Sequence, residues 1–180
     1  KTKNVHESSS KIITSKEKEL NDFSDATFNE ETQKVTFTNN FGKFDAKYKF
    51  SGPKNNNEVN IETVESLDDG LLFEPKFVKL DEENATNTVP VCAQLNTNHE
   101  YYRKVIFPNH HNENFINYFD ALIWAFCNAE LKTYSEQAKE NYKELRYDIS
   151  KSLRKLVEDF PEPKIDEEFE TNEIINDEQN

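Results

Sequence analysis

The residues with the greatest potential for chemistry lie near the middle of the chain, where His110 and His111 are followed by Glu113. Imidazole and carboxylate groups are common zinc ligands and acid–base catalysts, and His99 and Cys92 lie a little upstream. The spacing does not match a metal site, because no two histidines are four positions apart and no Cys-x-x-Cys occurs. We therefore predict a solvated loop at the paired histidines, with no metal and no cofactor.

Motifs for nucleophilic or nucleotide chemistry do not occur in the sequence. It contains no Gly-x-Ser-x-Gly, and its three glycines leave no Gly-rich loop that could hold a phosphate chain. Adjacent acids are frequent, but they lie in predicted turns or near the C-terminus, where solvated charge is the expected role. We predict that the protein is not an enzyme.

The balance of charge argues against two classes of partner. The chain of 180 residues has 22 Lys and Arg against 35 Asp and Glu, a formal net charge of −13. Direct binding to nucleic acid requires a basic surface, and so does electrostatic adhesion to anionic membranes. No apolar run approaches the roughly 18 residues of a membrane span, so we predict a soluble chain without one.

The two cysteines, Cys92 and Cys127, do not form a disulfide framework for a chain of this length, which slightly favours an intracellular over a secreted protein. Both lie among apolar residues and are interpreted as small buried hydrophobic side chains, with one disulfide as the alternative.

Two features are candidates for binding a protein partner. Residues 158–180 contain ten acids and one lysine, and their isolated apolar residues could dock into a groove: Phe160, Ile165, Phe169 and Ile174. Acidic segments also shield basic proteins, so the partner could be basic. Trp124, the single tryptophan, is the fifth predicted partner-binding residue, since tryptophan is enriched at binding hot spots. Packing over the open end of a sheet is its alternative role.

The spacing of apolar residues predicts the elements that position these candidates. Alternation with a period of two recurs from about residue 33 to 107 and predicts about six strands, beginning with a hairpin of Val35 and Phe37 with Phe44 to Phe50. Because the connections are too short for crossover helices, we predict an antiparallel sheet. Pro75 cannot donate to a strand ladder, which predicts an edge, a bulge or a break there.

Beyond Pro108 the apolar spacing changes to three and four residues. This predicts two amphipathic helices, over about 113–131 and 134–160, with Thr133 and Glu136 forming a capping box at the start of the second. The polar ends predict a flexible arm over residues 1–25 and an acidic disordered tail over 161–180, on either side of one α+β domain over 26–160.

The order of these elements resembles the pleckstrin-homology and phosphotyrosine-binding fold. The resemblance depends on Lys104–Phe107 as a final strand, a short loop, and a helix over 115–129. The second long helix and the lack of a basic loop for phosphoinositides depart from that pattern. The helix-grip fold of START-like lipid carriers, in which a curved sheet wraps a long terminal helix, is the alternative.

We therefore expect a non-catalytic protein–protein interaction module, an adaptor or assembly factor, that uses the helix pair, the acidic tail or both. A carrier of a hydrophobic small molecule or lipid, enclosed between sheet and helix, is the alternative, suggested by the Phe-rich strands and Trp124. The sequence leaves the oligomeric state open.

Overall fold

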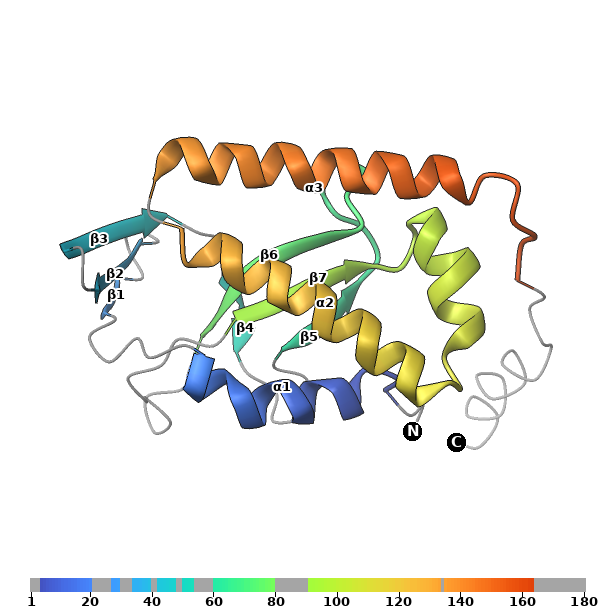
Figure 1. Ribbon diagram of the computed structural model, residues 1–180, viewed down its shortest axis with the longest axis horizontal. Helices are drawn as coiled ribbons and strands as arrows, with labels where there is room; N and C mark the ends of the chain where they lie inside the picture. The colour runs from blue at the N-terminus through green and yellow to red at the C-terminus, as the bar shows by residue number, and fades with distance from the viewer. Residues whose placement is uncertain are drawn as a thin grey trace, which may run out of the picture.

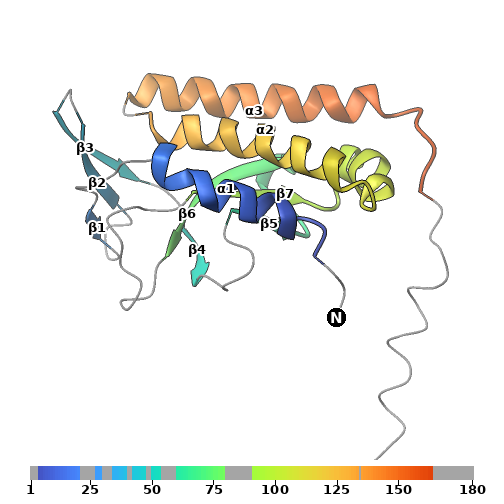
Figure 2. The same cartoon turned by 60° about the horizontal axis from the view of Figure 1, so that its bottom comes forward.

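The structure is a computed structural model. Its fold belongs to the α+β class, as predicted. Figure 1 shows helix α2 crossing in front of a four-stranded sheet, with α3 along one side and α1 along the other; Figure 2 shows the three helices layered over the sheet. The structure describes residues 4–20, 27–29, 34–39, 42–47, 50–53, 60–79, 91–133 and 135–163.

The strands form two sheets. One is antiparallel and contains β1 (Thr27–Asn29), β2 (Lys34–Asn39) and β3 (Gly42–Lys47). The other contains β4 (Phe50–Pro53), β5 (Ile61–Val64), β6 (Phe73–Lys79) and β7 (Val91–Asn96), in the order β4-β6-β7-β5. In this second sheet β6 and β7 are antiparallel, whereas β4 runs parallel to β6 and β5 parallel to β7.

The prediction of a single antiparallel sheet of about six strands is therefore wrong. It assumed that strands joined by short connections are neighbours. In the structure β7 instead inserts between β5 and β6, so the strand that follows β5 in sequence does not pair with it. All six residues of β7 are buried, which explains its position in the interior of the sheet.

Two finer predictions about the strands have clear outcomes. The hairpin is confirmed, with Val35 opposite Ala46 and Phe37 opposite Phe44. Strand β6 lies inside its sheet, but β4 pairs only with its residues 77–79. Among the described strands, Pro75 therefore has a partner on one side alone, at Ala93 of β7. The missing amide hydrogen of the proline is accommodated because β4 does not extend that far.

The last predicted strand, residues 101–107, is helical. Tyr102–Ile106 form a short π-helix, η3, and Phe107–Asn109 a 3₁₀ turn, η4. Tyr102 and Ile106 are both buried. Residues four positions apart lie on the same side of a helix and also on the same face of a strand, so this spacing does not distinguish the two. His99 begins the turn, because its Nδ1 accepts a hydrogen bond from the Tyr101 amide at 3.1 Å. This change also removes the strand on which the pleckstrin-homology resemblance depended.

The two predicted helices are present. Helix α2 spans Glu113–Leu131, as predicted, and the Asn112 side chain caps it by accepting from the Phe115 amide at 3.1 Å. Helix α3 spans Glu136–Leu156 and is shorter than predicted. Its cap is Ser135, which accepts from the Ala138 amide, whereas the Thr133 hydroxyl donates to the Ala129 carbonyl.

Helix α1, Glu7–Leu20, lies within the segment predicted to be a flexible arm, and this prediction is wrong for those residues. The buried side of α1 and the residue before it is formed by His6, Ser9, Ser10, Ile13 and Glu17. Because four of these five side chains are polar, the hydropathy pattern does not reveal the helix. The predicted tail begins in the described residues 161–163, and its remainder lies outside them.

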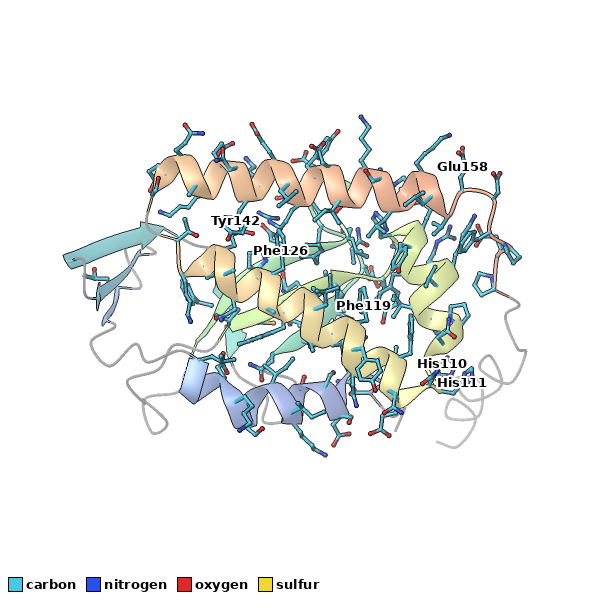
Figure 3. The ribbon with its side chains drawn as sticks, viewed as in Figure 1. His110, His111, Phe119, Phe126, Tyr142 and Glu158 are labelled. Carbon is cyan, nitrogen blue, oxygen red and sulfur yellow. The ribbon has the colours of Figure 1, made fainter. Side chains whose placement is uncertain are left out.

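The core lies between α2 and the four-stranded sheet. Phe126 of α2 contacts Phe73 of β6 and Tyr142 of α3 in edge-to-face geometry, with ring centroids 5.5 and 5.6 Å apart (Figure 3). Cys92 and Cys127 are both buried and free, as the first interpretation predicted, and burial raises the pKa of each thiol. Among the described helices, none is both long and apolar enough to cross a membrane.

Candidate functional site

The outward side of α2 carries two of the three most exposed large apolar side chains among the described residues. Tyr118 and Leu122 are 73% and 70% exposed. Ala121, Ala125 and Ala129 are exposed beside them. The spacing of three and four residues places all five on one side of the helix, and we call them the α2 face.

The α2 face contains no charge. Asp120 is the only charged residue between Glu113 and Glu130 in the sequence, and it is fully buried on the opposite side of the helix. Single exposed apolar residues are ordinary on a protein surface, whereas a contiguous stripe of them marks a site for a partner. The α2 face is therefore a candidate interaction surface.

On its inward side α2 contributes to a buried polar network. The Asp120 carboxylate accepts hydrogen bonds from His6 Nδ1 at 2.8 Å and from the Ser9 hydroxyl. His6 Nε2 lies 2.9 Å from Tyr102 Oη, so the network joins the start of α1, the middle of α2 and η3. A carboxylate, an imidazole and a hydroxyl in series are the parts of an acid–base relay.

The environment of this network favours a structural role over a catalytic one. His6, Asp120 and Tyr102 are 1%, 0% and 6% exposed. Burial, together with the charge of Asp120, raises the pKa of Tyr102 to about 12, so its hydroxyl keeps its proton near neutral pH. We interpret the network as the link that holds α1 and η3 against α2.

A second concentration of charge lines a pocket of about 490 Å³ between η3 and the C-terminal end of α3. We call it the basic pocket. Five of its residues are cations in a chain that is otherwise strongly acidic, and two of them are among the three arginines of the sequence. Its lining consists of Glu100, Arg103, Lys104, Lys151, Arg154, Lys155, Glu158 and Glu162.

Arg154 is held in place at one end of the basic pocket. Its Nε donates to Glu100 Oε2 at 2.9 Å and its Nη2 to the Gly70 carbonyl at 2.7 Å. Gly70 has a φ of +64°, a backbone conformation that favours glycine, and a Cβ there would lie 2.8 Å from Arg154 Nη2, so a larger residue would have to displace the end of that side chain. Burial opposes ionisation of Glu100, but hydrogen bonds from its own backbone and from Arg154 outweigh it and lower the pKa of that carboxyl.

The other paired cations of the pocket contact Glu162, Glu158 or the end of α3. Arg103 Nη2 and Lys104 Nζ lie 3.4 and 3.5 Å from the same oxygen of Glu162. Lys104 also donates to the carbonyls of Val157 and Glu158, which it caps at the end of α3, and Figure 3 shows Glu158 just beyond that helix. Lys155 pairs with Glu158.

Two donors in the basic pocket lack a partner among the described residues. Lys151 makes no hydrogen bond or ion pair within the described part of the chain, and it lines both this pocket and a smaller one of about 160 Å³ beside Gly70. Arg103 Nε is buried and has no acceptor among the same residues. The pocket therefore has donors available for an anion.

The described residues that were candidates for metal binding or acid–base chemistry have separate surroundings and do not form one site. The His110 ring stacks on Phe107 and its Nδ1 lies 2.6 Å from the Phe107 carbonyl, with the His111 ring packed edge-on against it (Figure 3). Glu113 accepts from the Ser8 hydroxyl, and His99 is buried, with Nε2 3.0 Å from the Ser150 carbonyl. Across the described ranges, no three His, Cys, Asp or Glu side chains are placed to hold a metal ion.

The predicted partner-binding residues have different surroundings. Trp124 is only 4% exposed and its Nε1 donates to the Val91 carbonyl at 3.0 Å, so it is a core residue that joins α2 to β7. Phe160 is 48% exposed in the turn that follows α3. Ile165, Phe169 and Ile174 lie outside the described residues.

Sequence analysis missed both Asp120 and the basic pocket. Asp120 carried a signal, since it is a lone acid four residues from Ile116 and four from Trp124, which places it on the buried side of α2. The basic pocket carried a weaker one, in two short runs of cations, Arg103-Lys104 and Lys151 to Lys155. Only the fold shows that these runs meet.

Comparison of the chain with protein-family models, with curated proteins and with solved structures gave no match. The resemblance to the pleckstrin-homology fold gains no support from a solved structure, and its final strand is helical. Function is therefore inferred from the geometry described above.

Proposed function

We propose that this protein is a non-catalytic interaction module that binds a basic amphipathic helix of another protein through the α2 face. The observation that carries the proposal is the high exposure of Tyr118 and Leu122 in an uncharged stripe. Burying large apolar side chains is the main source of affinity at protein interfaces, and tyrosine is enriched at hot spots.

The form of the α2 face favours a helical partner. Tyr118, Leu122, Ala125 and Ala129 follow one another at steps of four, three and four residues, the spacing with which two helices pack together. The exposed alanines leave room for the backbone of the partner to approach. A partner helix with its own apolar stripe would cover this surface.

The charge of the chain favours a basic partner. A formal net charge of −13 attracts cations over long range and repels acidic helices with a similar stripe. Lysines and arginines on the polar side of the partner helix would increase the rate of association and exclude acidic competitors, and this attraction is screened by salt.

The test uses a synthetic helical peptide with leucines on one side and lysines on the other, and a matched peptide with glutamates in place of the lysines. Leu122→Glu is compared with Leu156→Glu, because Leu156 is similarly exposed (72%) but lies at the end of α3. We expect calorimetry to show that Leu122→Glu weakens binding of the lysine peptide at least about tenfold, Leu156→Glu less than about twofold, and that the glutamate peptide does not bind.

Equal weakening by the two variants would show that charge alone attracts the peptide and would contradict the proposal. Light scattering provides a second measurement. A dimer of the unchanged protein that dissociates in Leu122→Glu would show that a second copy covers the α2 face, which would also overturn it. Both variants should unfold at nearly the same temperature as the unchanged chain, because the substituted positions are exposed.

The acidic tail remains a second predicted contact surface through Ile165, Phe169 and Ile174. Deleting residues 164–180 tests it and leaves Glu162 in the basic pocket. If the tail contributes, the deletion weakens binding of the lysine peptide with little change in thermal midpoint. The carrier alternative was suggested by the Phe-rich strands and by Trp124, and it is the weaker proposal because Trp124 is packed in the core.

A further inference from the structure

We propose that the basic pocket is a binding site for a phosphate monoester, and that Glu162 is a built-in competitor for it. None of the residues of the α2 face lines this pocket, so the inference stands independently of the proposed function. A volume of about 490 Å³ is in the range of small-molecule sites and leaves room for a group attached to the phosphate.

The first support is the concentration of positive charge. The lining contains five cations and three carboxylates, a balance of +2 in a chain of net charge −13. Cations at the C-terminal end of a helix also complement its dipole, and this accounts for Lys104 and Lys155, which cap or flank the last turn of α3. The helix dipole does not account for Lys151, which lies more than one turn before the end of α3, or for Arg103, which belongs to η3.

The second support is the way in which Glu162 occupies the pocket. One carboxylate oxygen bridges Arg103 and Lys104 at 3.4 and 3.5 Å, distances longer than those of a tight charge-assisted hydrogen bond. The Glu162 side chain is 59% exposed. A carboxylate thus already marks the anion position, and it is bound loosely enough to be displaced.

The third support is the set of unused donors. Lys151 has no partner in the described residues, and Arg103 Nε is buried without an acceptor. A phosphate monoester carries a charge of roughly −1.5 to −2 and three acceptor oxygens, so it can engage more of these donors at once than a carboxylate. A nucleic acid strand would present many phosphates to an acidic surface, which favours a single phosphate group.

The experiment is a titration of the ¹⁵N-labelled full chain with inorganic phosphate and with O-phosphoserine at constant ionic strength. We expect saturable shifts confined to amides of residues 100–104 and 150–162. Lys151→Glu tests the site, and Lys143→Glu is the matched control, because Lys143 is also exposed on α3 but lies outside the pocket and changes the net charge equally.

We expect Lys151→Glu to weaken phosphate binding about tenfold or more and Lys143→Glu less than about twofold. Glu162→Gln should tighten binding about two- to fivefold, because it removes the competing carboxylate. Equal effects of the two lysine variants, weaker binding in Glu162→Gln, or shifts that do not saturate would each overturn the proposal.

The same titration identifies the source of the phosphate. A Gly-phosphoserine-Gly peptide that binds at least about tenfold more tightly than O-phosphoserine indicates a phosphorylated protein segment. Similar affinities for the two indicate a free phosphate ester. Both results support the site, and they assign it to different ligands.

Discussion

The two sides of η3 hold their polar groups in opposite ways. On the inner side, Tyr102 joins His6 and Asp120 in a network whose members are at most 6% exposed and whose described contacts measure 2.8 and 2.9 Å. On the outer side, Arg103 and Lys104 reach an exposed carboxylate, Glu162, at 3.4 and 3.5 Å.

This difference suggests separate roles: the inner contacts stabilise the fold, and the outer contacts are available for binding a ligand. Water does not compete with the inner contacts, so removing one partner leaves other buried groups without hydrogen bonds. The outer ion pairs with Glu162, whose side chain is 59% exposed, are open to water and screened by salt, so they contribute little to folding and can be exchanged for contacts with a ligand. Variants on the inner side should therefore unfold the chain more easily, whereas variants on the outer side should change binding alone.

The largest effect is expected for Asp120→Ala. It removes the acceptor of His6 Nδ1 and of the Ser9 hydroxyl in a site without solvent. We expect urea denaturation to show a loss of about 3 kcal/mol in the free energy of unfolding. Asp148→Ala, at an exposed position of α3, is the control and should change stability by less than about 0.5 kcal/mol. A loss below about 1 kcal/mol in Asp120→Ala would show that the network does not hold α1 and η3 in place.

The next effect is a dependence of stability on pH through His99, which begins the turn that leads into η3. Burial lowers the pKa of His99, and the neutral ring is the form that accepts from the Tyr101 amide. As pH falls through about 6.5, the unfolded chain takes up a proton at this histidine before the folded chain does. Its contribution to stability is therefore complete above that pH and lost below it, by at most about 1.4 kcal/mol per pH unit.

His99→Asn measures this contribution, because asparagine is neutral throughout and can still accept from the Tyr101 amide. Between pH 7.5 and 5.5, we expect the free energy of unfolding to fall less in the variant than in the unchanged chain. The other three histidines are present in both proteins, so any contribution from them cancels in the comparison. Parallel pH profiles would show that burial does not oppose protonation of His99, which would contradict this prediction.

Sequence could predict elements whose pattern is local and repeated. Helix α2 follows from a long run with a period near 3.6, and the β2–β3 hairpin from alternation on both sides of a turn. The order of the second sheet could not be predicted in this way, because the insertion of β7 between β5 and β6 depends on contacts between distant segments. Helix α1 was hidden because its buried side is polar, with His6, Ser9 and Glu17 facing inward.

The candidate sites also differ in whether a local sequence pattern could predict them. An exposed apolar face on α2 cannot be read from sequence alone, since Tyr118 and Leu122 are apolar like the core residues around them and only packing leaves them outside. The basic pocket requires two distant runs of cations to meet, and it also requires η3 to be helical where alternation predicted a strand. Asp120 is the exception, because a lone acid on the apolar side of a helix could be identified from its spacing.

The smallest expected effect distinguishes the outer side from the inner one most sharply. Glu162→Gln removes the carboxylate that Arg103 and Lys104 share but keeps the size of the side chain. Because Glu162 is exposed, we expect urea denaturation to show a change of less than about 0.5 kcal/mol in the free energy of unfolding, and a still smaller one at high salt. The same variant should bind phosphate more tightly. A loss of about 2 kcal/mol or more would instead make Glu162 a structural tie between the C-terminal segment and η3, and the outer contacts would then belong with the inner ones.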